Sequence, residues 1–313
     1  EIEHNNVNYI LKPMNCPCHI DIFNNSTKSY RNLPLRIAEF GSCYRNEPSG
    51  SLYGLMRLKN FTQDDGHIFC SDEQLIDEIQ VFIKNLKKVY SKFGFNVFNT
   101  ILSKRPIVKI GEDKIWDIAE SHLETAIKNL ELNYEISNDG AFYGPKLEFS
   151  LQDNTGKSWQ CGTIQIDFFT AKRLNAKYTS KNGKIKNPII LHRAILGSIE
   201  RFIGILLEVN NGNLPFWLLP EQIIILTINK DSINYAINVF NKLKSVYKTT
   251  INFSDEEICS KIKESLFKKI PYIIIIGENE SKKNTLSIRI KKNTVIKDIS
   301  LNDFFEILKG ENY

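Results

Sequence analysis

Apolar and polar residues follow two different patterns along the chain, and the change between them falls near residue 215. Before that point, a helical period predicts an amphipathic helix over residues 71–93 and a shorter one over 115–130. Other segments alternate with a period of two, which is typical of strands. The remaining predicted elements of this part are a strand over 7–12, a proline-flanked turn over 13–19, two strands within 140–168 around a turn at 153–156, an exposed loop over 174–188 and an apolar helix over 192–208.

After residue 215, short apolar runs alternate with amphipathic segments. The runs predict strands over 223–229, 272–277 and 286–292, with a further short strand before a helix that ends at Lys269. Helices are predicted over 232–247 and 301–308 as well. Strands that alternate with helices indicate a small α/β domain with a mainly parallel sheet.

The stretch over residues 39–67 carries an unusual set of polar side chains. Its halves predict two antiparallel strands joined by a Pro-Ser-Gly loop at 48–50. Because alternate residues of a strand share a face, an unbroken second strand groups Arg57, Lys59, Phe61, Gln63, Asp65 and His67, and Arg45 and Glu47 can join them from the first. A solvated sheet face is the simpler interpretation. Two features favour instead a site for a polyanion and a small zwitterion. Buried charges destabilise a folding core unless they are paired. Phe61 also lies in the middle of the charged row, where only stacking on a ligand would explain it.

Composition permits this interpretation without requiring it. A chain of 313 residues is long enough for about two domains. Its net charge of +5 is compatible with a nucleic-acid partner but does not demonstrate one. Six cysteines in a chain of this length indicate reduced thiols and a cytoplasmic protein rather than a disulfide scaffold. No apolar run approaches the ~20 residues that span a bilayer, so no membrane association is expected.

Three residues that are far apart in the sequence form a candidate metal site. Cys16, His67 and His192 each stand at the edge of a segment rich in functional residue types. One cysteine and two histidines suit Zn²⁺, and three protein ligands leave a fourth position open for substrate. Structural roles for all three remain the alternative. The other histidines fit a metal site less well: His4 is near the first residue, His122 lies in a predicted polar helix and His19 has no matching sequence context.

Six motifs, in the order KPMNCPCH, FGSCYRNEPSG, NFTQDDGHIF, GAFYGPKLEF, SWQCGTIQIDF and HRAILGSIERFIG, resemble the catalytic core of the threonyl-tRNA synthetases. These enzymes are class II aminoacyl-tRNA synthetases. The resemblance implies an α+β catalytic domain over 1–215, with an antiparallel active-site sheet of six or seven strands. A smaller α/β anticodon-binding domain over 216–313 follows. The implied reaction activates L-threonine with ATP to threonyl-adenylate and pyrophosphate, and then transfers threonine to the 3′ end of tRNA(Thr).

The resemblance also implies roles for single residues. One Zn²⁺ is held by Cys16, His67 and His192. Arg45 and Arg201 are the catalytic arginines, which hold the phosphates. ATP binds with Mg²⁺, and the positions around it are Glu47, Arg57, Phe61, Lys146, Gln160, Thr163 and Ser198. The positions around threonine are Met14, Gln63, Asp65, Tyr143 and Gln165. Glu280 and Arg289 match contacts to the tRNA anticodon.

The chain departs from the family in two respects. Cys18 stands where a glycine is usual. The chain also begins after the expected first class II motif, without an initiator methionine, and lacks an editing domain. We therefore expect a fragment of a longer enzyme that is a homodimer at full length. Three alternatives stay open: a prolyl or seryl enzyme, a non-catalytic synthetase-like RNA-binding protein or a fragment inactive on its own, and a nucleic-acid-binding protein with a closed zinc site.

Overall fold

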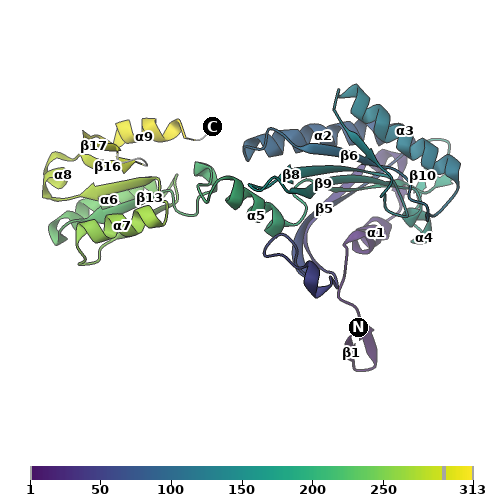
Figure 1. Cartoon of the computed structure of the whole chain (residues 1–313), viewed down its shortest axis with the longest axis horizontal. Coiled ribbons are helices and arrows are strands. Elements are labelled where there is room, and N and C mark those ends of the chain that lie inside the picture. The colour runs from purple at the N-terminus through teal and green to yellow at the C-terminus, as the bar shows by residue number, and fades with distance from the viewer. Residues whose placement is uncertain (1, 291–293, 312–313) are drawn as a thin grey trace. The chain divides into compact units, whose positions relative to one another are not determined.

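The computed structural model of the protein describes residues 2–290 and 294–311. It consists of two compact units, and the boundary between them falls between Asn211 and Gly212. Each unit is built around a sheet of its own (Figure 1). Within the described ranges, no helix combines the length and the apolar composition that a membrane crossing requires.

Seven strands of the first unit form its main sheet among the described residues. In spatial order they are β4 (Leu35–Tyr44), β5 (Asn60–Cys70), β12 (Ile189–Ala194), β9 (Ser158–Asp167), β8 (Lys146–Gln152), β6 (Asn99–Ser103) and β7 (Glu135–Ser137). Neighbouring strands are antiparallel, except that β6 and β7 run parallel. The predicted antiparallel sheet is thus confirmed, although β6 and β7 were not predicted.

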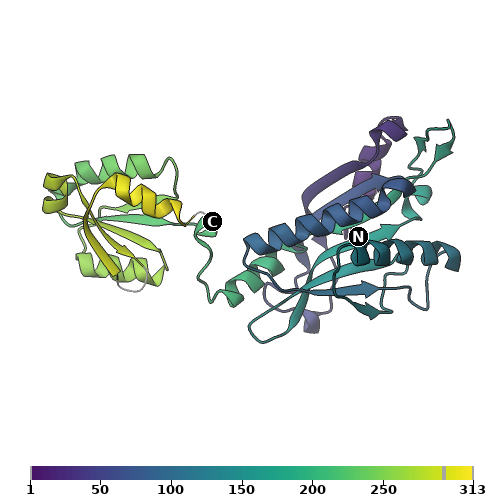
Figure 2. The ribbon, with the colours of Figure 1, turned by 90° about the horizontal axis from the view of Figure 1, so that it is seen from above.

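Helices α2 (Leu75–Lys92) and α3 (Asp113–Asn129) cover one face of this sheet (Figures 1 and 2). A side chain at Gly162 of β9 would come within 2.5 Å of Leu86, so α2 packs close to the centre of the sheet. The buried side chains of Ile164 and Ile166 alternate along β9 with Thr163 and Gln165. This alternation leaves the polar residues for the opposite face, where α1 (Cys16–Asn24) lies (Figure 1).

Smaller elements complete the first unit. Strands β1 (Ile2–His4) and β2 (Val7–Tyr9) form a hairpin that projects away from the sheet (Figure 1). A three-stranded sheet joins β3 (Lys28–Ser29), β10 (Tyr178–Thr179) and β11 (Ile185–Lys186). The exposed loop predicted over 174–188 therefore contains two short strands, and Tyr178 is buried there. Helices α4 (Thr170–Arg173) and α5 (Ile199–Val209) follow β9 and β12.

The prediction of a helix over 192–208 is wrong for the first half of this range. Residues up to Ala194 belong to β12, and α5 begins only at Ile199. Gly197 separates the two elements with a φ of +71°, a conformation that L residues rarely adopt. Ser198 then caps the helix by accepting a hydrogen bond from the backbone N–H of Arg201. The apolar run hid this boundary, because a buried strand and a buried helix have similar composition.

Three other predictions need correction at the site. The turn predicted over 13–19 gives way to α1 at Cys16, and Pro17 lies in the first turn of this helix. The strand predicted over 7–12 ends at Tyr9. The connection in the predicted hairpin runs from residue 45 to 59 rather than over 48–50, so Arg57 and Lys59 precede β5. Lys59 instead accepts a backbone hydrogen bond from Arg45 across the end of the hairpin.

We expect Gly197→Ala to destabilise the first unit by at least about 2 kcal/mol. A Cβ atom there would combine the positive φ with a 2.5 Å contact to the carbonyl oxygen of Cys161. Gly183→Ala is the matched control, because Gly183 has a φ of +76° but nothing within 4 Å of the added atom. Urea denaturation followed by circular dichroism measures both changes. Equal losses for the two variants would contradict the predicted clash.

The second unit has a five-stranded sheet in the order β14 (Thr249–Asn252), β13 (Ile223–Thr227), β15 (Tyr272–Ile276), β16 (Leu286–Ile290) and β17 (Thr294–Ile299). Helices α6 (Ile233–Leu243) and α9 (Leu301–Lys309) pack on one face, where Ala236, Val239, Phe304 and Leu308 join the core. Helix α7 (Ile258–Phe267) packs on the other face (Figure 2). Helix α8 (Glu278–Lys283) follows β15.

This sheet is less parallel than predicted. The pairs of β13 with β14 and β15 are parallel, whereas β15–β16 and β16–β17 are antiparallel. The reason is that a short helix, α8, returns the chain to β16, and no long crossover is present there to keep the direction parallel. The predicted strand over 286–292 reaches Ile290, and Lys291 and Lys292 lie outside the described residues.

Candidate active site and metal centre

A cavity of about 420 Å³ opens on the face of the seven-stranded sheet opposite α2 and α3. Its walls include all fourteen residues for which the sequence predicted contacts to ATP or threonine. They are Met14, Arg45, Glu47, Arg57, Phe61, Gln63, Asp65, Tyr143, Lys146, Gln160, Thr163, Gln165, Ser198 and Arg201. Cys16 and His192 line the same cavity. Its size suits a nucleotide-sized ligand.

Strand register brings the central side chains together. His192 of β12 pairs with His67 of β5 on one side and with Gln165 of β9 on the other. Gln165 in turn pairs with Lys146 of β8. Residues that are directly opposite in an antiparallel ladder point to the same face. His192, Gln165 and Lys146 of this row line the cavity, and His67 is buried beside them. Along β5, the predicted alternation of Phe61, Gln63, Asp65 and His67 holds within one unbroken strand.

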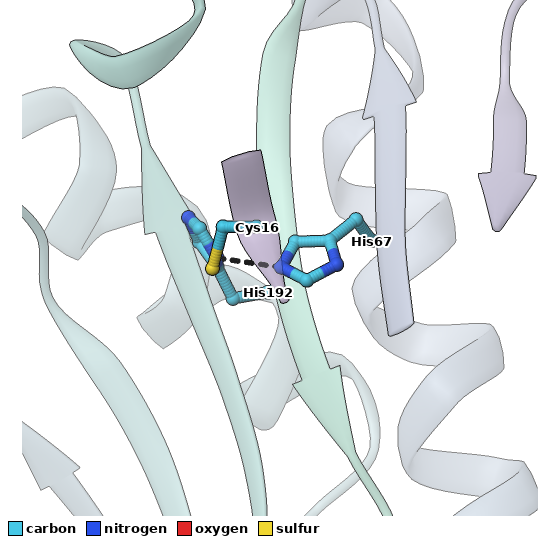
Figure 3. Close-up of side chains that lie close together, drawn as sticks. All are labelled: Cys16, His67 and His192. Atoms are coloured by element: carbon cyan, nitrogen blue, oxygen red, sulfur yellow. Dashed lines mark hydrogen bonds between the residues drawn. The ribbon is translucent and has the colours of Figure 1, made fainter. Parts of the chain in front are cut away.

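The predicted metal ligands converge from three separate elements (Figure 3). Their ligand atoms all lie within 4.8 Å of one another. His67 Nε2 is 3.0 Å from His192 Nδ1, and Cys16 Sγ is 3.3 Å from the same His192 nitrogen. Zn–N distances near 2.0 Å and Zn–S distances near 2.3 Å require neighbouring ligands at about this spacing. One thiol and two imidazoles therefore fit a single zinc ion.

The two histidines differ in charge. Burial and the neighbouring charge of His192 lower the pKa of His67 to about 2, so its imidazole is neutral and keeps a lone pair. Burial acts against the charge of His192 too, but hydrogen bonds to Asp167 and Cys16 prevail and raise its pKa to about 10. His192 Nε2 lies 2.9 Å from an Asp167 carboxylate oxygen. A cation bound at this cluster would therefore replace a proton.

The two candidate phosphate-binding arginines, Arg45 and Arg201, are oriented by hydrogen bonds to neutral backbone carbonyls. Arg201 donates to the backbone carbonyls of Met56 and Gln160, both at 2.7 Å. Burial, helped by the neighbouring charges of Arg57 and Arg45, lowers the pKa of Arg201. Arg45 donates to the carbonyl of Pro13 at 3.2 Å, and its guanidinium lies 5.1 Å from the centre of the Phe61 ring. Both cations are thus oriented and available to an anion.

The other side chains of the predicted nucleotide site already interact with one another. Arg57 donates two hydrogen bonds to one oxygen of Glu47, at 2.7 and 3.0 Å. Lys146 forms an ion pair with Glu148. The Gln160 side chain donates to Thr163 at 2.8 Å. Ser198 already caps α5, a structural role that is enough to explain its hydroxyl without any contact to ATP.

Around the predicted threonine site, Asp65 is 5% exposed, and burial raises the pKa of its carboxyl group. A carboxylate in such a position favours a cationic partner such as an ammonium group. Gln165 donates to the carbonyl of Gly144 at 2.9 Å, which fixes its side chain beside the cavity. The Tyr143 ring lies 5.7 Å from the His192 ring, next to the metal ligands.

Three buried residues at the site were not predicted to take part. Asn15 donates to Asp65 at 2.9 Å, His19 contacts His67, and Asp167 contacts His192. The Oδ1 atom of Asn15 has no hydrogen-bond partner among the described residues. The C-x-x-H spacing of Cys16 and His19 was a usable signal, because it places both on one face of a helix. Predicting a turn there removed that signal.

The predicted anticodon residues lie in the second unit. Glu280 of α8 accepts hydrogen bonds from the backbone of Gly277 and from the hydroxyl of Ser287. Burial acts against its charge, but these hydrogen bonds prevail and lower the pKa of Glu280. Arg289 follows Ser287 by two positions on β16, so the two residues share a face of the sheet. Glu280 and Arg289 therefore lie on the same side of this strand.

Comparisons with known proteins agree with this architecture. Residues 1–210 match the family described as "tRNA synthetase class II core domain (G, H, P, S and T)", and residues 222–311 match the "Anticodon binding domain" family. The threonine–tRNA ligase of Marinobacter nauticus is 46% identical over 97% of this chain and 48% of its own length. That of Ehrlichia ruminantium is 52% identical over 89% of the chain and 44% of its own length. The chain thus spans about half the length of these curated relatives.

A solved structure supports the same assignment. The crystal structure of the RNA binding domain of threonyl-tRNA synthetase from Cryptosporidium parvum superimposes with a TM-score of 0.88. It is 38% identical, and the match covers 96% of this chain and 76% of that one. The resemblance predicted from the six motifs is confirmed. The chain belongs to the class II aminoacyl-tRNA synthetases, and within them to the threonyl-tRNA synthetase family.

Proposed function

We propose that the protein acts as a threonine–tRNA ligase, which makes threonyl-adenylate from L-threonine and ATP and then threonylates tRNA(Thr). One observation carries the proposal. The side chains expected to hold ATP and threonine line one cavity next to a Cys–His–His cluster. The relatives named threonine–tRNA ligase support the same activity.

The chemistry of the first step suits the side chains in the cavity. A carboxylate oxygen of threonine forms a bond to the α-phosphorus of ATP, and the bond from that phosphorus to the bridging oxygen breaks as pyrophosphate leaves. The nucleophile is already an anion, so no general base is needed. Catalysis then consists of holding the reactants in line and neutralising charge. We assign Arg45 to the α-phosphate and the threonine carboxylate, and Arg201 to the γ-phosphate.

The remaining side chains position the two substrates. Phe61 would stack on the adenine ring, and Glu47 would accept a hydrogen bond from the adenine amino group. Arg57 would lie near the pyrophosphate. Lys146, Gln160, Thr163 and Ser198 would line the nucleotide. Asp65 would accept a hydrogen bond from the threonine amino group, in agreement with its buried carboxyl group at the wall of the cavity. Met14, Gln63, Tyr143 and Gln165 would enclose the amino acid.

Metal ions complete the proposal. Cys16, His67 and His192 would hold one Zn²⁺, which supplies a Lewis acid able to take the amino group and hydroxyl of threonine. Mg²⁺ bound with ATP would neutralise part of the phosphate charge. The chain's own contribution is to keep His67 neutral and in place, and to leave one side of the cluster open to the cavity through Cys16 and His192.

In the second step, the 3′-terminal ribose hydroxyl of tRNA attacks the carbonyl carbon of the adenylate and AMP leaves. We propose that the second unit binds the anticodon. A homodimer, the domain boundary between 215 and 216, and a cytoplasmic location stay predictions. The alternative of a non-catalytic RNA-binding protein predicts loss of a cavity arginine or a metal ligand, and Arg45, Arg201 and the three ligands are present.

Threonine-dependent exchange between ATP and pyrophosphate tests the proposal directly. The assay should use the complete gene product, with the present chain alongside it. We expect exchange with threonine, weak exchange with serine and none with valine, because valine lacks the hydroxyl. Exchange that depends on proline or serine but not on threonine would contradict the assignment. No exchange with any amino acid, together with retained tRNA binding, would favour the non-catalytic alternative.

We expect Arg289→Ala to weaken aminoacylation of tRNA(Thr) while leaving pyrophosphate exchange intact. Removing one charged contact to RNA lowers affinity without affecting the adenylate site. Lys242→Ala is the matched control, because it removes the same charge from the exposed surface of α6, which packs on the opposite face of the sheet. Equal losses in both assays for Arg289→Ala would point to misfolding instead of lost tRNA contact.

A further inference from the structure

His19 is a buried imidazole in a position where the fold needs no polar group. It lies on the buried face of α1 with Cys16, Ile20 and Phe23, and only 2% of it is exposed. Ile20 and Phe23 of this face pack into an apolar cluster. A leucine would fill such a position at lower cost, because each buried polar atom needs a hydrogen-bond partner. The structure supplies a partner for both ring nitrogens of His19.

His19 Nδ1 lies 2.7 Å from His67 Nδ1, and His19 Nε2 lies 3.2 Å from a carboxylate oxygen of Glu39. Glu39 stands opposite Asp65 in the β4–β5 ladder, at the rim of the same sheet face. Its carboxylate is 36% exposed and lies 3.8 Å from the ammonium group of Lys12. The contacts therefore run from His67 through His19 to a charged group at the surface.

When His67 binds a cation, the protons on the hydrogen bonds from His67 through His19 to Glu39 can be placed in only one way. Coordination through His67 Nε2 leaves that nitrogen without a proton, so Nδ1 carries it and donates to His19 Nδ1. The proton of His19 is then on Nε2, from which it donates to Glu39. Every donor has one acceptor, and no nitrogen is left unsatisfied.

The second histidine ligand, His192, contacts a carboxylate directly, without an intervening imidazole. His192 presents Nδ1 to the cluster, and its Nε2 lies 2.9 Å from Asp167. The other oxygen of Asp167 accepts backbone hydrogen bonds from Phe169 and Thr170, which fix the carboxylate. Each histidine ligand is thus linked to a carboxylate, directly for His192 and through a second imidazole for His67.

We propose that His19 and Glu39 are positioning residues that hold His67 in the tautomer and orientation required to bind the cation. This inference rests on the proposed metal-binding role of Cys16, His67 and His192. Neither residue is assigned to contact the metal or the substrate. Groups of this kind around a metal ligand contribute about 10- to 100-fold to metal affinity.

The test measures metal binding rather than catalysis. The chain is stripped of metal with a chelator and titrated with Zn²⁺ against a competing chelator, and in parallel with Co²⁺, whose visible spectrum reports ligand identity and geometry. We expect His19→Leu to weaken Zn²⁺ binding by about 10- to 100-fold and to alter the Co²⁺ spectrum. His19→Asn should recover part of the affinity, because its amide oxygen can accept the proton of His67. Glu39→Ala should cause a smaller loss.

Two controls separate this inference from the proposed metal site. His67→Ala should abolish binding, and His122→Leu should leave it unchanged, because His122 lies in α3 on the other face of the sheet. One outcome would overturn the role of His19 but not the proposed metal site. In it, His19→Leu keeps wild-type affinity and an unchanged Co²⁺ spectrum, whereas His67→Ala loses binding. An unmodified chain that binds no metal would overturn both. If His19→Leu does not fold, wild-type affinity of both His19→Asn and Glu39→Ala would overturn the inference.

Discussion

Replacement of Arg45 by alanine is expected to lower threonine-dependent pyrophosphate exchange by at least ~100-fold. The guanidinium projects into the cavity, and the carbonyl of Pro13 and the ring of Phe61 hold it there before any substrate binds. A donor that is already oriented needs no rearrangement as negative charge develops at the α-phosphate. The measurement is the exchange rate at saturating ATP and threonine in the complete gene product.

Arg45→Lys should rescue this loss poorly, because an ammonium group cannot bridge a carboxylate and a phosphate with one planar fork. Arg31→Ala is the matched control. Arg31 is an exposed arginine whose guanidinium lies 5.6 Å from the centre of the Tyr30 ring, so it has a similar aromatic contact outside the cavity. Exchange rates near normal in Arg45→Ala would remove Arg45 from the mechanism.

Loss of the metal ion is expected to abolish threonine activation. The chain should contain about one zinc ion per molecule by elemental analysis, and chelation or His67→Ala should remove it along with exchange activity. His67 is fully buried, so it makes no direct contact with a substrate in the cavity. Its replacement therefore acts through the metal, and its expected effect is as large as that of removing the ion.

His122→Ala serves as the control for the loss of a histidine outside the cluster. Adding Zn²⁺ back to the stripped wild-type protein should restore exchange, whereas adding it to His67→Ala should not. Full threonine activation by a demonstrably metal-free protein would overturn the proposed role of the cluster. Activation of valine by the zinc-loaded protein would overturn the proposal that the threonine hydroxyl is recognised there.

Period-two alternation predicted the polar face of β5 correctly from Phe61 onward, but it extended the strand too far toward Arg57 and Lys59. Along β5, the order Phe61, Gln63, Asp65, His67 was sufficient to place four side chains on one face. At β12 the same method failed, because the apolar run around His192 carries no clear period and the break at Gly197 depends on a single backbone angle. The register that sets His192 beside His67 comes from long-range pairing, which local patterns do not encode.

His19 illustrates the other limit of sequence reasoning. His19 has apolar neighbours on its own helix and a polar contact with His67 on a strand. From the sequence alone, it cannot be distinguished from a surface residue, because both features arise only when α1 packs on the sheet. Asp167 is similar, because its value to the site depends on a β9–β12 pairing. Asn15, His19 and Asp167 all lie within the quoted motifs, so motif membership alone did not separate supporting residues from residues expected to contact substrate. Their supporting contacts become visible only once the strands and α1 are packed together.

The three elements that supply Cys16, His67 and His192 are far apart along the chain. The pairs Cys16–His192 and His67–His192 are separated by 176 and 125 residues. A cation shared by these ligands would therefore act as a removable cross-link between a helix and the centre of a sheet. Closing long loops restricts the unfolded chain strongly, as a disulfide of the same span does in the chain-entropy description. Unlike a disulfide, this link would be set by the concentration of free metal, so the free energy of unfolding of the first unit would rise with metal concentration.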